Sequence, residues 1–318
     1  MNQPLFDMGG LEGPPKPPIR SERPGKAGAL LVLGYAAAVT LLAPVVEAPA
    51  TPPVKVSWQP SHPRVGDVAV LVVEGPGDGA VVEGAVGGRP VRFFRDARGY
   101  AALIGFDMEL TSGRQPWRIE IREPGRRARS VGGALQLGGR EFPVQRLTLP
   151  TPMVDLDPET ERRAIAEGNV LRTLYRTITP ERLWRGSFVR PVAGNEPGTG
   201  FGSRRIINGQ PRTSHSGTDY SVPRGTPVVS VNDGRVALVA DYFFPGRLVV
   251  VDHGLGLYTL YFHLDEARVE SGERVVRGQP LGTVGSTGRA TGAHLHFGVQ
   301  VGAARVDPER LFALPLPD

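Results

Sequence analysis

The feature that most constrains the fold of this chain is an alternating run near its C-terminus. In residues 295–301, leucine, phenylalanine and valine alternate with histidine, glycine and glutamine. An alternation with a period of two is typical of a strand that buries one face. His294 and His296 are two residues apart, so both imidazoles project from the face opposite Leu295 and Phe297. The run therefore predicts a half-buried strand with two imidazoles on its polar face.

Residues 184–318 around this strand predict an all-β domain. Short apolar runs are separated by turn signals such as Asn232-Asp233-Gly234, and no helix of ordinary length fits between them. Hairpin connections of this kind join antiparallel strands. The expected strands are 227–231, 235–240, 248–252, 258–264, 281–284 and 295–301.

Residues 54–150 predict a second, smaller β domain. Short strands at regular spacing, with turn signals such as Glu123-Pro124-Gly125 between them, indicate a sandwich of immunoglobulin-like type. No catalytic set is evident here, and His62 is expected to be an isolated loop histidine. The apolar runs and alternations that carry this expectation lie at 54–58, 68–73, 91–94 and 117–121.

Residues 151–183 predict a helical connector. Asp157 is a favourable N-cap, Pro158 suits the first helical position, and Glu159 places negative charge in the first turn. The ordinary role of such a helix is to dock on one of the domains, and an inhibitory or positioning arm is the alternative. The helix should continue to about Thr177, with a partly apolar stripe of Ala164, Val170, Leu171, Leu174 and Tyr175.

The N-terminal segment predicts export. Residues 1–26 are polar, basic and rich in proline and glycine, which is typical of a disordered cytoplasmic lead. Residues 27–50 contain an uncharged run long enough to cross a bilayer, which takes about 20 residues. Basic residues before it and an acidic residue after it place the remainder of the chain outside. We expect a signal peptide or an uncleaved inner-membrane anchor, with a buried core helix as the alternative, and a periplasmic or cell-envelope location.

The composition narrows the chemistry that is available. The chain of 318 residues has no cysteine, so disulfides, thiolate nucleophiles and cysteine-based metal sites are excluded. Its net charge of +5 suits an anionic partner such as an envelope polymer or a phospholipid. The arginines are scattered, without aromatic interleaving or a basic helix, so no nucleic-acid partner is expected.

Histidines and one aspartate are the candidates for chemistry. His215 and Asp219 are four residues apart, and a loop that enters a strand could aim both side chains inward. His263 is expected on the polar face of its strand together with Tyr261 and Thr259, away from Phe262 and Leu264. His253 starts a turn and is expected to be a polar turn residue. Nitrogen and carboxylate ligands that converge from separate segments, with one open position, are what a catalytic metal needs.

Several short motifs together resemble the LytM or lysostaphin type of zinc metallopeptidase, family M23, over residues 184–310. The matching pieces are Phe201-Gly202-Ser203-Arg204-Arg205, His215-x-x-x-Asp219, Asp252-His253-Gly254, Tyr261-x-His263-Leu264, Gly278-Gln279-Pro280-Leu281-Gly282, Gly285-Ser286-Thr287-Gly288 and His294-Leu295-His296. The chain departs from the family pattern at Arg247 and Ala293, in segments that should shape the substrate groove.

The resemblance implies a function and a set of residue roles. One Zn²⁺ per peptidase domain would be held by His215, Asp219 and His296. His294 would act as the general base, and His263 would stabilise the oxyanion or protonate the leaving amine. The expected activity is hydrolysis of peptide bonds in peptidoglycan, with the bond cleaved, the role of the sandwich and the oligomeric state left open.

Two other functions were weighed against this expectation. A lipoyl or biotinyl carrier domain has similar hairpins, but it needs an acceptor lysine and the last lysine of the chain is Lys55. The remaining alternative is a module that binds the cell wall, or activates another wall hydrolase, without catalysis. Family relatives of that kind lose metal ligands, whereas this chain retains every ligand position.

Overall fold

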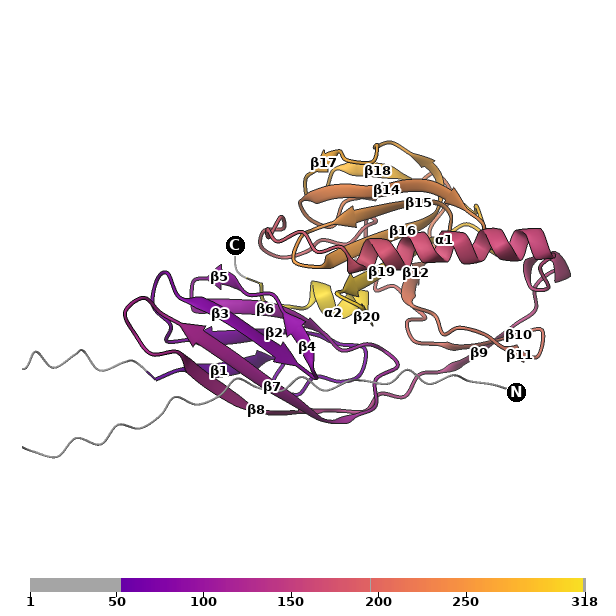
Figure 1. Cartoon of the computed structure of the whole chain (residues 1–318). Coiled ribbons are helices and arrows are strands. Elements are labelled where there is room, and N and C mark those ends of the chain that lie inside the picture. The colour runs from indigo at the N-terminus through magenta and orange to yellow at the C-terminus, as the bar shows by residue number, and fades with distance from the viewer. Residues whose placement is uncertain (1–52, 195, 317–318) are drawn as a thin grey trace, which may run out of the picture. The chain divides into compact units, whose positions relative to one another are not determined.

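The computed structural model describes residues 53–194 and 196–316, and the segments predicted at 1–26 and 27–50 lie outside these ranges (Figure 1). No helix within the described ranges is both long and apolar enough to span a bilayer. The described residues belong to one compact unit. The domain limits expected near 150 and 183 therefore stay predictions.

The predicted sandwich is confirmed as two four-stranded antiparallel sheets, with strand orders β1-β2-β6-β5 and β4-β3-β7-β8 (Figure 1). The apolar run at 91–94 is divided between the two sheets, because the chain there leaves β4 in one sheet and enters β5 in the other. The strands are β1 (Lys55–Gln59), β2 (Val68–Glu74), β3 (Val81–Val86), β4 (Arg89–Val91), β5 (Phe94–Asp96), β6 (Gly99–Gly105), β7 (Gly113–Arg122) and β8 (Arg129–Leu137).

Strand β2 is buried on both faces. On one face of β2, Ala69, Leu71 and Val73 point into the core between the two sheets. Val70 and its neighbours of the other parity join a second core that also contains Trp184 and Val249. A strand covered on both sides needs a continuous apolar run, and this explains why the sequence of β2 does not alternate.

A nine-stranded antiparallel sheet makes up most of the C-terminal part, as expected for an all-β peptidase domain (Figure 1). Its central order is β12-β19-β16-β15-β14-β17, with β13, β18 and β20 attached. All six predicted strands are present, and the short strands β12, β17 and β20 were not predicted. The elements are β12 (Gly217–Tyr220), β13 (Pro227–Val229), β14 (Gly234–Tyr242), β15 (Gly246–Asp252), β16 (Leu257–Ala267), β17 (Arg274–Val275), β18 (Pro280–Val284), β19 (Leu295–Val301), β20 (Ala304–Val306) and the short helix α2 (Pro308–Phe312).

A small three-stranded sheet joins segments that are far apart in the chain. Strand β10 (Arg204–Ile207) pairs in parallel with β9 (Val144–Leu147), which leaves the sandwich, and antiparallel with β11 (Gln210–Pro211). A single 3₁₀ turn, η1 (Thr151–Met153), follows β9. This parallel pairing was not predicted, and it places β9 next to the residues that precede His215.

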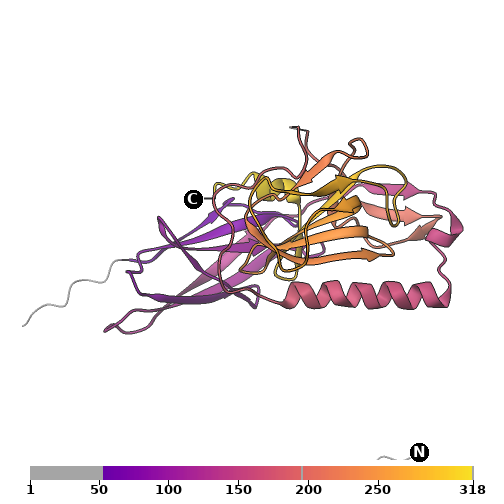
Figure 2. The same cartoon turned by 90° about the horizontal axis from the view of Figure 1, so that it is seen from above.

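The predicted connector helix is α1 (Pro158–Arg176), and it begins and ends as expected. The carboxylate of Asp157 caps it by accepting from two backbone N–H groups, and Thr177 is the C-cap. The helix docks on the outer face of the large sheet beside β14 (Figure 2). The prediction that Val170 belongs to the apolar stripe is wrong, since this residue is 48% exposed. The stripe residues that pack on the sheet are Leu171, Leu174 and Tyr175, against Leu248, Val250, Tyr258 and Leu260.

Candidate metal centre

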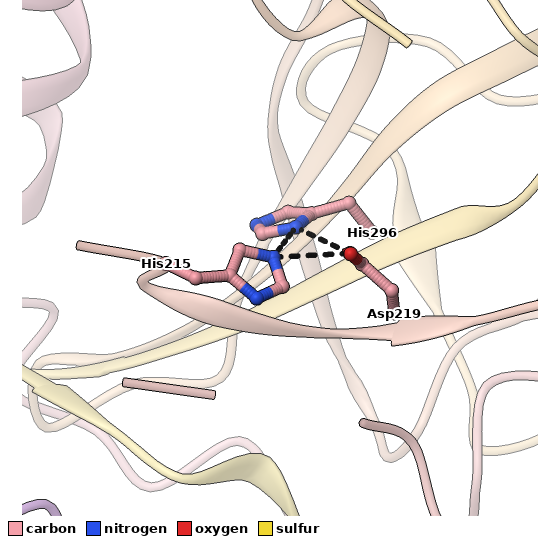
Figure 3. A group of neighbouring side chains, drawn as sticks. All are labelled: His215, Asp219 and His296. Atoms are coloured by element: carbon pink, nitrogen blue, oxygen red, sulfur yellow. Dashed lines mark hydrogen bonds and ion pairs between the residues drawn. The ribbon is translucent and has the colours of Figure 1, made fainter. Parts of the chain in front are cut away.

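Three side-chain donor atoms meet at one point in the large sheet (Figure 3). His215 Nε2 lies 2.8 Å from His296 Nδ1 and 3.1 Å from Asp219 Oδ1. The third side of the triangle, from His296 Nδ1 to Asp219 Oδ1, is 2.9 Å. The sequence analysis singled out these three residues as ligands, and the fold brings them together.

Strand pairing explains the convergence. Asp219 on β12 is the antiparallel partner of His296 on β19, so their side chains share one face of the sheet. His215 lies in the loop just before β12 and reaches the same point, as expected for a loop that enters a strand. Gly217 between them is required by close packing, because a Cβ there would lie 2.4 Å from the carbonyl oxygen of Phe297. The four-residue spacing of His215 and Asp219 is therefore not that of a helix face.

The orientation of His215 leaves a lone pair at the centre. Its Nδ1 lies 2.8 Å from the carbonyl oxygen of Gly200, which can only accept a hydrogen bond. In the neutral ring the proton is therefore on Nδ1, and the lone pair of Nε2 faces the other two donor atoms. A carbonyl that orients a ligating imidazole in this way is a common support of metal sites.

The donor set fits zinc. Two imidazole nitrogens and one carboxylate oxygen are a frequent protein ligand set for a catalytic zinc, which keeps the fourth position open. The separations of 2.8–3.1 Å are close to the roughly 3.4 Å edge of a tetrahedron with metal–ligand bonds of about 2.1 Å. Without a cation, the Nε2 lone pair of His215 and the carboxylate would face each other unfavourably.

Electrostatics keep the ligands in the protonation states that a cation needs. Burial alone would raise the pKa of Asp219, but the facing imidazoles of His215 and His296 outweigh it and hold this pKa below its ordinary value. Burial lowers the pKa of His296 to about 4, so this imidazole is neutral at pH 7. The other carboxylate oxygen, Asp219 Oδ2, lies 3.7 Å from a guanidinium nitrogen of Arg205.

His263 reaches the site by a local irregularity of β16. The expectation that it alternates with Tyr261 on a polar face is wrong, because Tyr261 and Leu264 are both buried in the main core. His263 has a φ of 63°, and the pairing of β15 with β16 shifts register beside it. This bulge inserts one residue and turns the imidazole out of the core and toward the metal ligands. Its ring centroid lies 6.1 Å from that of His296.

The imidazoles of His263 and His294 are held in the same tautomer. His263 Nδ1 donates to the carbonyl of Thr287 at 2.8 Å, and His294 Nδ1 donates to that of Gly292 at 2.9 Å. In the neutral form of each ring, Nε2 therefore carries the lone pair. The two ring centroids are 4.7 Å apart, and His294 Nε2 is 3.9 Å from Asp219 Oδ1. Burial, followed by the neighbouring histidines, lowers the pKa of His263 to about 3, so it is neutral at pH 7.

A cavity of about 330 Å³ opens onto these residues, at the lower end of the size range of ligand pockets. Its walls include Gln145 and Leu147 from β9, together with Arg205 and Arg289. The sequence analysis did not single out these four residues. Both arginines lie within or beside quoted motifs, which could have pointed to them, but nothing in the sequence signals that β9 lines this cavity.

His253 is not the polar turn residue that was expected. Its side chain is buried, with Nδ1 donating to the carbonyl of Asp233 at 2.7 Å and Nε2 accepting from the hydroxyl of Thr259 at 2.8 Å. Burial lowers its pKa to about 4. His253 is thus a neutral core residue away from the cavity, whereas His62 is an exposed loop histidine as expected.

Comparisons with known proteins agree with this geometry. The family model of "Peptidase family M23" matches residues 213–308. This range contains His215, Asp219, His263, His294 and His296. Peptidoglycan DD-endopeptidase ShyA of Vibrio cholerae is 41% identical over 131 residues, which cover 41% of this chain and 28% of ShyA. Peptidoglycan DD-endopeptidase ShyC of the same organism is 38% identical over 137 residues, covering 42% of this chain and 31% of ShyC. The chain thus spans about three tenths of the length of these curated relatives.

One solved structure extends the similarity beyond residues 213–308. A crystal structure from Pseudomonas aeruginosa, described as a peptidase M23, is 32% identical, with a TM-score of 0.61. The alignment covers 79% of this chain and 95% of that one, so it includes most of the described residues and not residues 213–308 alone. With this shared fold and the family match around the three converging donor atoms, the chain belongs to peptidase family M23.

Proposed function

We propose that this protein is a zinc-dependent endopeptidase that cleaves peptide bonds of peptidoglycan. The observation that carries the proposal is the convergence of His215, His296 and Asp219 at one edge of a cavity that His263 and His294 also line. A zinc ion at this point would act as a Lewis acid on the scissile carbonyl and lower the pKa of a water molecule to about 7.

His294 and His263 are suited to the proton transfers. In the tautomer imposed by Gly292, the Nε2 lone pair of His294 can accept the proton of the attacking water. The ring centroid of His263 lies 4.7 Å from that of His294. Its Nε2 can take a proton and pass it to the leaving amine. The low pKa of His263 means that any proton it takes is readily given up.

The D,D cross-link is the proposed target. ShyA and ShyC, which the chain resembles around the site, carry the name peptidoglycan DD-endopeptidase. A cross-link joins two stem peptides, and an open cavity that is not closed over by described residues suits such a branched substrate. Peptidoglycan lies outside the cytoplasmic membrane, so the protein would act in the cell envelope after export.

The proposal is tested with purified protein, zinc analysis and cross-linked muropeptide dimers. We expect one zinc per chain and conversion of dimers to monomers, identified by mass spectrometry. Removal of zinc with a chelator should abolish the conversion, and added zinc should restore it. A protein that carries no zinc and releases no monomers, but still sediments with walls, would be the non-catalytic wall-binding module instead.

A further inference from the structure

The cavity beside the three converging donor atoms has a net positive charge from its lining residues. Arg205 and Arg289 line it from β10 and from the loop that precedes β19. Asp219 is the single carboxylate among the described residues that line the cavity, and its charge is shared between Arg205 and the metal site. A bound zinc ion would add two further positive charges. The cavity therefore has an excess of positive charge that a substrate must balance.

Arg289 is the cation with capacity to spare. Its guanidinium carbon lies 4.2 Å from the ring centroid of Phe244, so one face of the group is stacked on an aromatic ring. Within residues 53–194 and 196–316, no carboxylate or carbonyl pairs with this guanidinium. Stacking holds the plane in place while its N–H edge stays available, and that edge matches the two oxygens of a carboxylate.

The surroundings make an unpaired charge at Arg289 costly. Burial lowers the pKa of Arg289, and the positive charges of Arg205 and Arg212 lower it further. A guanidinium that is partly desolvated and repelled by its neighbours gains more from an anion than one in water does. Arg205 is itself a cation and cannot supply the anion that Arg289 would bind. Its own Nε donates to Gln145 Oε1 at 3.4 Å.

From this geometry we infer that Arg289, assisted by Arg205, selects peptides that carry a free carboxylate near the scissile amide. The inference rests on the proposed function and adds a substrate preference to it. Arg289 binds the carboxylate through its free edge, while Arg205 supplies a second positive charge across the cavity. A peptide whose carboxylates are converted to carboxamides loses this interaction and leaves the guanidinium unpaired.

The test compares a cross-linked muropeptide dimer that has free carboxylates with the same dimer in fully amidated form. We expect the wild-type protein to cleave the free-acid dimer with a kcat/KM higher by roughly 10- to 100-fold, the range of a charge-assisted hydrogen bond. In Arg289→Gln this ratio should fall toward one, and Arg289→Lys should give an intermediate ratio because lysine keeps the charge without the fork.

Controls separate recognition from folding. Arg235→Gln removes an exposed arginine on β14 outside the cavity and should retain the wild-type ratio. Zinc content and Tm are measured for each variant, so that a loss of the site is not mistaken for a loss of selectivity. Calorimetry of the binding of both dimers to His294→Ala gives the same comparison without turnover.

The outcomes distinguish this inference from the proposed function. If the wild-type protein cleaves both dimers equally well, or if Arg289→Gln keeps the preference with full zinc content, the carboxylate role of Arg289 is wrong and the endopeptidase stands. If neither dimer is cleaved or bound, the proposed function and the carboxylate role are both wrong.

Discussion

Asp219 and His296 stand directly opposite each other in the antiparallel pairing of β12 with β19, with Oδ1 and Nδ1 2.9 Å apart. Sheet register thus brings together two donors that are 77 residues apart in the chain. His294, two residues before His296, lies on the same side, but its Nε2 is 3.9 Å from the same carboxylate oxygen. The two histidines therefore have different places in the site, one among the donor atoms and one beside them.

This difference predicts that two alanine substitutions differ in their effect on zinc content. His296→Ala removes a ligand and should lower zinc content to near zero, with loss of activity. His294→Ala should retain one zinc per chain while kcat falls by roughly 10²- to 10⁴-fold, the usual contribution of a general base. Zinc is measured by atomic emission and kcat with muropeptide dimers. A zinc-free His294→Ala protein would show that our roles for the two residues are wrong.

The carbonyl of Gly200 predicts a backbone contribution to zinc affinity. A Cβ at this position would lie 2.9 Å from His215 Nδ1, where the orienting hydrogen bond now runs. Gly200→Ala should therefore weaken zinc binding by roughly 10- to 100-fold, measured by competition with a chelator. The matched control is Gly209→Ala, because Gly209 also has a positive φ, of 78°, but open space around it. Equal affinities in the two variants would argue against a role for the Gly200 contact.

Thr287 predicts a positioning role for His263. Its hydroxyl accepts from the Arg247 N–H at 2.9 Å and donates to the carbonyl of Leu264 at 2.9 Å, while its own carbonyl holds His263 Nδ1. Thr287→Val should free this loop and lower kcat by roughly 10- to 100-fold, with little change in KM and none in zinc content.

The control for Thr287 is Thr226→Val. The hydroxyl of Thr226 also donates to a carbonyl, that of Pro223 at 2.7 Å, but at an exposed turn outside the cavity. This variant should keep the wild-type kcat. A rise in KM without a fall in kcat for Thr287→Val would place Thr287 in substrate binding instead.

His253 predicts a loss of stability in mild acid. Its folded-state pKa of about 4 lies below the ordinary value of 6.5, so the unfolded chain takes up the proton first as the pH falls. The stabilisation is complete above pH 6.5 and is lost progressively down to about pH 4, for a total of about 3 kcal/mol.

Urea unfolding of metal-free protein between pH 4.5 and 8 checks this prediction. In His253→Gln, the free energy of unfolding should vary less with pH, by up to one proton. His62→Gln, at an exposed loop, should follow the wild-type curve. If the wild-type and His253→Gln curves run parallel over this range, His253 is not the group responsible.

The sequence by itself determined much of the architecture. The alternation of β19 placed Leu295 and Phe297 in the core and the histidines opposite them, because a strand offers two faces with a period of two. The cap at Asp157 predicted the start of α1. These features depend on a few neighbouring residues, and local sequence therefore specifies them.

Only the tertiary structure decided the surroundings of the site. The bulge at His263 depends on pairing with β15, and the local alternation gave the wrong face for Tyr261. The parallel pairing of β9 with β10, which brings Gln145 to the cavity, joins segments about 60 residues apart and leaves no local signal. Burial of His253 likewise depends on Thr259 and Asp233, which the fold supplies from β16 and from the turn before β14. Long-range pairing sets these contacts, and a period or a cap in one segment carries no information about its partner.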